Sequence, residues 1–203
     1  MNKKKLLKGF DEVHFAPFTE GGDSYATPVR IHNAKKIESD LEYESDDDWG
    51  DDQILISEYN YAGGEGTLTT VGLDKKEYNT LFNNKIVKGG IVVNANDIAK
   101  EGAFLFSRKK KGSTHKRLYV LYACKCSQSG VSAESIESGK GPAGEDEINF
   151  KIGQDADGNI LHFIDTDDET VDSNAITNWF KEVQKPKDVG RLSEDQKEVK
   201  VKK

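Results

Sequence analysis

Carboxylate side chains are the most concentrated reactive groups in this sequence. Nine of them, and no Lys or Arg, fall between Glu38 and Asp52 in the stretch IESDLEYESDDDWGDD. Carboxylates that converge on one point can bind Ca²⁺, whereas carboxylates spread along a surface repel other anions. The stretch therefore has three interpretations: a metal site, a disordered acidic linker, or one wall of a negatively charged surface.

A second acidic stretch, DADGN at 155–159, resembles the start of a calcium-binding EF-hand loop. Its glycine comes two positions too early, and no helices flank it, so we interpret it as a hairpin turn built on Asp157–Gly158. Acidic loops are commonly just solvated, and for 46–52 we favour that interpretation over a metal site. We expect no bound metal ion and no cofactor.

The histidines do not form a catalytic constellation. They are scattered along the chain, and the sequence has no G-x-S-x-G, no P-loop, no G-x-G-x-x-G after a strand and no H-E-x-x-H. The absence of these motifs removes the common enzyme classes, and we predict a protein that is not an enzyme. The four positions are His14, His32, His115 and His162.

Cys124 and Cys126 are two positions apart in YACKCS. On a strand they share a face, where a direct disulfide is strained, and no second pair completes a metal site. We expect two reduced, packed thiols.

Composition predicts one polar, water-exposed domain. The chain has 203 residues, a net charge of -7, 32% charged and 35% hydrophobic residues, and a mean hydropathy of -0.71. The negative charge argues against a dedicated nucleic-acid binder. The sequence contains no run of about 18 apolar residues, so we expect no membrane-spanning helix. The apolar run in MNKKKLLKGF is too short for a secretory leader. We expect the protein in the cytoplasm.

From Ile37 onward the acidic stretch alternates strictly. Ile37, Ser39, Leu41 and Tyr43 point to one side of the predicted strand, and four acids point to the other: Glu38, Asp40, Glu42 and Glu44. We expect this strand over 37–45, a loop over 44–52, and the partner strand in QILISEY at 53–59. The partner offers no cations to relieve the acidic face.

The remaining pattern is that of a mainly β protein with one or two flanking helices, a sandwich or barrel over 10–184. We expect a flexible lead at 1–9, a long loop at 127–145 and a loose charged tail at 185–203. In order, the predicted elements are short edge strands at 12–18 and 27–34, a strand at 66–73, a helix at 74–84 with an Asp74/Glu77 capping box, a strand at 89–97, a long hairpin at 103–127, a second hairpin at 147–165 and a helix at 172–184. That last helix would dock through Ile176, Trp179, Phe180 and Val183.

The tip of the long hairpin is basic. Its run RKKKGSTHKR contains no aromatic residue, so the stacking platform of a single-strand nucleic-acid binder is missing. A solvated tip is the simpler interpretation, and contact with an acidic patch on another copy is the alternative. The cations are Arg108, Lys109, Lys110, Lys111, Lys116 and Arg117.

An ordered set of segments resembles the major tail proteins of long-tailed bacteriophages. The set consists of LKGFDEVHFAPFTEGG, SYATPVRIHNAKKIESDLE, TVGL before a short helix, GGIVVNANDIAKEGAFLF, KRLYVLYACKC and AITNWFKEV, covering roughly residues 8–184. The sequence departs from the family in its Lys-rich tail after Pro186 and its unusually acidic 38–52.

The resemblance implies a tail tube subunit that forms hexameric rings stacked into a hollow tube, with a fold shared by the tube proteins of contractile secretion machines. Viral DNA would pass through without specific binding. The implied partners are other copies and the tape measure, tail terminator and distal tail proteins, and the implied location is the virion tail, assembled in the host cytoplasm.

On this interpretation Glu38, Asp40, Glu42 and Glu44 face the lumen, and the basic-tip cations and the acidic loop make contacts between subunits or rings. The contact residues of the loop would be Asp46, Asp47, Asp48, Trp49, Asp51 and Asp52. The alternative is a Ca²⁺-stabilised β-sandwich binding module that uses the acidic loop and forms no tube.

Overall fold

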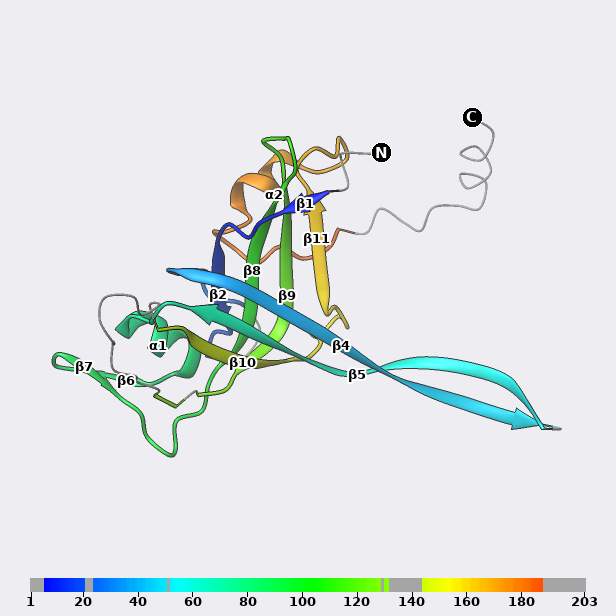
Figure 1. Ribbon diagram of the computed structural model, residues 1–203, viewed down its shortest axis with the longest axis horizontal. Helices are drawn as coiled ribbons and strands as arrows, with labels where there is room; N and C mark the ends of the chain where they lie inside the picture. Colours follow the sequence, from blue (N-terminus) through cyan, green and yellow to red (C-terminus); the bar gives the residue numbers. More distant parts are fainter. Residues whose placement is uncertain (1–5, 21–23, 51, 129, 132–143, 188–203) are drawn as a thin grey trace, which may run out of the picture.

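The structure is a computed structural model that describes residues 6–20, 24–50, 52–128, 130–131 and 144–187 (Figure 1). Most of the predicted loop at 127–145 and of the tail at 185–203 lies outside these residues. The elements are β1 (Leu7–Lys8), β2 (Val13–Pro17), β3 (Val29–Ile31), β4 (Ala34–Gly50), β5 (Gln53–Thr70), α1 (Lys75–Phe82), β6 (Lys85–Val87), β7 (Gly90–Val92), β8 (Glu101–Lys110), β9 (Lys116–Cys126), β10 (Asp146–Ile152), β11 (Leu161–Asp165) and α2 (Ser173–Asn178).

Nine strands of the described chain form one antiparallel sheet, which confirms the predicted mainly β fold. The strand order is β3-β2-β8-β9-β10-β5-β4, with β1 paired to β8 and β11 paired to β9, while β6 and β7 form a separate small hairpin. Leu7 and Lys8, at the end of the predicted flexible lead at 1–9, form strand β1 opposite Lys110 and Lys109, whereas residues 1–5 of that lead lie outside the described residues.

The sheet bends along β9. Residues 117–121 of β9 pair with β11, and residues 124–126 pair with β10. Ala123, between the two sections, has a left-handed φ of 47°. The bend turns β10, β5 and β4 so that they cross β8, β9 and β11 at a steep angle (Figure 1).

The prediction of a second hairpin at 147–165 is wrong, because β10 and β11 each pair with β9 and not with each other. The turn itself is present. Asp155 accepts hydrogen bonds from the backbone N–H groups of Asp157 and Asn159, and Gly158 has a φ of 79°. The prediction of the turn was therefore correct, but the two strands that it joins each pair with the longer strand β9.

The core lies on both faces of the sheet. Inside the bend, Phe15 and Phe104 pack with Phe150 from the crossing strands and with Phe82 of α1. Strand alternation sends the intervening residues of β8 and β9 to the opposite face, where they surround Trp179. Cys124 and Cys126 are free and buried inside the bend, as predicted, and burial raises the pKa of Cys126 to about 12.

Helix α1 begins with the predicted capping box. The Asp74 carboxylate accepts from the backbone N–H of Glu77, and the Glu77 carboxylate accepts from the backbone N–H of Asp74. The box fixes the start of the helix, and its apolar face then buries Leu81 and Phe82.

Helix α2 is shorter than predicted. It begins after Asp172, whose side chain caps it, and ends at Asn178 instead of continuing to 184. We call the buried residues around Trp179, on the face of the sheet outside the bend, the outer core cluster. All four predicted docking residues nevertheless belong to this cluster or pack against it: Ile176, Trp179, Phe180 and Val183. Trp179 is 1% exposed, and its indole N–H donates to the Tyr119 carbonyl at 3.3 Å.

Candidate functional site: a projecting arm and a charged hairpin tip

Strands β4 and β5 form a hairpin that runs far beyond the rest of the sheet (Figure 1). Strand β10 pairs with β5 only from Gly64 to Thr70, so residues 43–50 and 53–61 pair only with each other within the described chain. We call these residues the arm. Its base is anchored by Tyr61, whose hydroxyl donates to the Ile152 carbonyl at 2.9 Å. Beyond this anchor the arm is a two-stranded ribbon.

The arm corrects the prediction of a loop at 44–52. Asp46, Asp47 and Asp48 lie opposite Glu58, Ser57 and Ile56 in antiparallel register. The register then shifts by one residue, so that Trp49 lies opposite Ile54, and β4 extends to Gly50 before β5 begins at Gln53. Asp52 has a φ of 62°, a left-handed conformation that suits a turn, and Asp51 lies outside the described residues.

One face of β4 carries an unbroken row of acids. The alternation predicted for the four lumen candidates is confirmed, and it continues through two more strand positions. The row faces further acids on β5, since Asp40 lies opposite Glu65 and Asp46 lies opposite Glu58. Such like pairs destabilise an antiparallel ladder. The row consists of Glu38, Asp40, Glu42, Glu44, Asp46 and Asp48.

Little positive charge relieves this row within the described chain. Lys36 pairs with Glu38 at 2.7 Å, and Lys151 of β10 lies across the ladder from Glu65. Every carboxylate of the row is exposed, so water screens the repulsion in the isolated subunit. The face is therefore strongly negative and hydrated.

The opposite face of the arm is aromatic. Tyr43 and Tyr61 are cross-strand neighbours with ring centroids 5.6 Å apart, and Tyr59 and Trp49 follow toward the tip. Tyr59 is 73% exposed and Trp49 is 66% exposed. At the distal end Ile54 and Leu55 are also exposed, as is Ile56, which lies opposite Asp48 on the acidic face. Exposed apolar side chains gathered on one element mark an interaction surface.

The basic tip of the β8–β9 hairpin places like charges opposite each other. Lys109 lies across from Lys116, and Arg108 lies across from Arg117. Asp11 relieves the lysine pair, with its carboxylate 2.6 Å from the Lys116 ammonium and 3.4 Å from that of Lys109. The Lys116 hydrogen bond in particular holds the pKa of Asp11 below its usual range.

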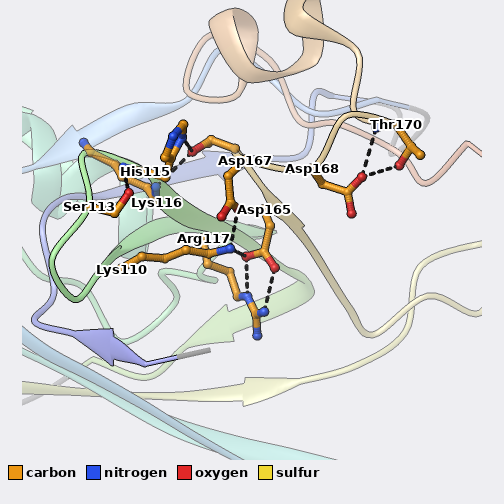
Figure 2. Close-up of polar contacts among 10 residues, drawn as sticks. Lys110, Ser113, His115, Lys116, Arg117, Asp165, Asp167, Asp168 and Thr170 are labelled. Carbon is orange, nitrogen blue, oxygen red and sulfur yellow. Dashed lines mark hydrogen bonds and ion pairs between the residues drawn. The ribbon is translucent and has the colours of Figure 1, made fainter. Parts of the chain in front are cut away.

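On the other face of the tip, Asp165 of β11 accepts two hydrogen bonds of 2.7 Å from Arg117 and lies 3.2 Å from the Lys110 ammonium (Figure 2). Lys110 also donates to Asp167. The Arg117 hydrogen bonds lower the pKa of Asp165. Burial disfavours the Lys110 cation, but its bonds to Asp167 and Asp165 outweigh burial and raise the pKa of Lys110.

These ion pairs revise the predicted contact residues of the tip. The Lys110 side chain is only 4% exposed, so we no longer expect Lys110 to contact another subunit. Lys109, Lys116 and Arg117 are engaged within the subunit. Arg108 and Lys111 are exposed and have no ion-pair partner among the described residues.

Sequence reasoning missed the carboxylates that neutralise the tip. Asp165 and Asp167 belong to the acidic run DTDDE at 165–169, whose strong charge was the available signal. Asp11 lies far away in sequence, and only the pairing of β1 and β2 with β8 brings it to the tip.

The one cluster of potential metal ligands found among the described residues is His32, Asp74 and Glu77. Its geometry is explained without an ion. Glu77 accepts from the His32 backbone N–H at 2.6 Å, from the His32 ring and from the Asp74 backbone N–H. The cluster joins the end of β3 to the capping box of α1, and we assign it a structural role.

No family model and no characterised protein matches this sequence. No helix of the described residues is long and apolar enough to cross a membrane. The fold and site define a mainly β protein with a projecting, two-faced arm.

Proposed function

We propose that this protein is a self-assembling subunit of a phage tail tube, stacked in hexameric rings in the virion tail. The observation that carries the proposal is the arm. A two-stranded ribbon is marginally stable alone in water, and this one also exposes Trp49, Leu55 and Tyr59. Contact with a neighbouring copy would bury these side chains, and assembly is therefore the simplest reason for such a structure.

The acidic row supports a role for the sheet face in lining the tube. Non-specific DNA binding depends on cations that neutralise phosphates. The row from Glu38 to Asp48 extends about 33 Å along β4, given a rise of about 3.3 Å per residue. A wall of this kind offers DNA no place to adhere, so a duplex would pass along it without being retained.

The ion pairs of the tip support a rigid subunit body. Asp11 and Asp165 fasten the two faces of the hairpin to the segment before β2 and to β11 through contacts of 2.6 to 2.7 Å. A ring that repeats many times needs subunits of one shape, and a fastened tip provides a fixed edge. The tape measure, tail terminator and distal tail proteins would then meet the ends of the assembled tube.

Electron microscopy of the purified protein, with sedimentation over a range of concentrations, tests the proposal. Rings or tubes are expected. A monomer that persists at high concentration contradicts it. Thermal melts with and without Ca²⁺ distinguish the alternative of a calcium-stabilised module, because an ion that binds only the native state raises the melting midpoint. We expect no shift.

A further inference from the structure

A groove lies where the first part of β4 passes over β8, β9 and β11. Its volume is about 390 Å³, within the range of pockets that hold ligands of roughly 300 to 1,000 Å³. Ile37 forms one wall, and the floor contains Phe106, Tyr119 and Leu161. The groove is thus mainly apolar and opens between the two halves of the bent sheet.

The groove floor belongs to an aromatic row that continues to the surface. The Phe106 and Tyr119 rings stack at 4.8 Å, and the Tyr119 and Phe163 rings are 5.8 Å apart. Phe163 is 45% exposed and Leu161 is 42% exposed. Large apolar side chains exposed at the end of such a row provide a ready contact for another aromatic side chain.

Three cations lie at the groove, and two of them are already paired. Lys35 is 2.6 Å from Glu145, and Lys36 is 2.7 Å from Glu38. Arg108 has no ion-pair partner among the described residues. A carboxylate on the occupant of the groove would also relieve the repulsion between Arg108 and its cross-strand neighbour Arg117.

The arm has the matching chemistry. Its aromatic face presents Trp49, and Asp47, two positions earlier on the same strand, shares that face. We propose that the arm of one copy docks in this groove of a second copy, with Trp49 against the apolar floor and Asp47 toward Arg108. This inference rests on the self-assembly in the proposed function and specifies the contact.

The covalent geometry requires that an arm lying in this groove come from a second copy. Ile37 lines the groove and Trp49 lies twelve residues along the same strand, at a distance of about 40 Å when extended. The arm cannot turn back into its own groove without breaking β4. In the proposed rings each copy gives its arm to one neighbour and receives an arm from another, a head-to-tail contact that permits closed rings or open growth.

Charge reversal tests the contact. Arg108→Glu should raise the concentration needed for assembly about tenfold or more, because it places a carboxylate against the incoming Asp47. It should leave the fold intact, since Glu opposite Arg117 forms a favourable cross-strand pair. The second change Asp47→Lys should restore assembly to the Arg108→Glu protein.

Lys88→Glu is the matched control. It makes the same charge change at an exposed position in the turn between β6 and β7, outside the groove and outside the predicted contact residues. Assembly of this control should match the unaltered protein. Equal losses in the two variants, or unaltered assembly of the Arg108→Glu protein, would overturn the docking proposal.

Disulfide crosslinking locates the contact directly. With Trp49→Cys and Leu161→Cys in one chain, mild oxidation should give a ladder of multimers, because every copy carries both halves of the contact. Trp49→Cys with Ile98→Cys, an exposed position lining a different pocket, should give no ladder. The native Cys124 and Cys126 are buried.

The outcomes separate the two proposals. Tubes seen by microscopy without a ladder refute the docking contact and leave the tube function standing. A ladder from open chains without tubes supports the contact and contradicts the tube. A monomer without a ladder contradicts both.

Discussion

Arg108 and Arg117 lie directly opposite each other across the β8–β9 hairpin. Two arginines in this relationship repel each other. The next strand resolves half of the conflict, because Asp165 lies opposite Arg117 and accepts two hydrogen bonds from its guanidinium, each of 2.7 Å. Arg108 is left at the groove. The pairing of the sheet thus neutralises Arg117 and leaves Arg108 without an ion-pair partner among the described residues.

Asp165→Asn should lower the free energy of unfolding by about 2 to 3 kcal/mol. Removing one partner of a largely buried ion pair leaves an uncompensated charge, and here both Arg117 and the 4% exposed Lys110 lose a carboxylate. Urea denaturation of the monomer measures the change. Glu145→Gln removes the exposed Lys35 pair and should cost less than about 0.5 kcal/mol. Equal effects of the two substitutions would contradict the role assigned to Asp165.

The buried His14 should make the protein less stable in mild acid. Burial, aided by the nearby charges of Arg30 and His32, lowers the pKa of His14 from 6.5 to about 4. Between these values the unfolded chain binds a proton that the folded chain does not, so the free energy of unfolding falls as the pH falls, by roughly 3 kcal/mol in total.

His14→Phe is the variant that checks this slope. It removes the titration and keeps an aromatic ring against Phe180, whose ring centroid is 4.7 Å from that of the histidine. Urea unfolding at several pH values between 7 and 4 should show a flatter dependence than in the unaltered protein. Some slope remains, because burial also lowers the pKa of His162. An unchanged slope would count against His14 as the source.

The sequence predicted the alternation of β4 and failed at its length. Asp and Gly are typical turn formers, so 44–52 indicated a loop. The partner segment QILISEY is rich in strand formers, and pairing with it extends β4 to Gly50. The continued alternation of Glu44, Asp46 and Asp48 was the available signal. A local preference was overridden by the cross-strand partner.

Long-range pairing was the part that local patterns could not supply. The Asp157–Gly158 turn was recognised, but the sequence does not show that β9 is long enough to hold both β10 and β11 on one edge. The same limitation hid the partners of the basic tip. Its cations are obvious in the chain, whereas the position of Asp11 depends on the register of β2 with β8.

Trp179→Ala should cost about 3 to 5 kcal/mol of unfolding free energy. The indole is 1% exposed, fills the outer core cluster and donates to the Tyr119 carbonyl, so its removal leaves a cavity and an unused acceptor. Trp49→Ala is the matched control. That side chain is 66% exposed, so monomer stability should change little while assembly is impaired. Denaturation measures the stability of the two variants, and sedimentation measures their assembly. A Trp179→Ala protein as stable as the unaltered one would refute the role of Trp179 in holding α2 and the residues after it against the sheet.

Gly66→Ala should destabilise the sheet, because a Cβ there would lie 2.3 Å from the Phe150 ring and 2.5 Å from the Glu38 carbonyl. Either the ring must move or β4 must separate from β5. Gly90→Ala places the same methyl group where nothing lies within 4 Å, and it should be nearly neutral. Comparing thermal midpoints of the two variants checks whether this close approach fixes the crossing of the strands, and equal midpoints would contradict it.

The acidic row gives the prediction that depends most directly on the proposed tube. Replacing Asp40 and Glu42 together by Lys should leave assembly intact, because both are exposed and lie between the groove and the arm. Assembled tubes of this variant should retain duplex DNA at low salt and release it as salt rises, whereas unaltered tubes retain none. In infected cells the same variant should impair DNA delivery.

The corresponding Gln variant separates charge sign from shape. It removes the same carboxylates without adding cations, so it should neither retain DNA strongly nor disturb β4. If lumenal charge matters through repulsion, DNA retention should increase from the unaltered protein to the Gln variant and then to the Lys variant. Equal retention and intact infectivity in all three would mean that this face does not line the path of the DNA, even if the protein forms tubes.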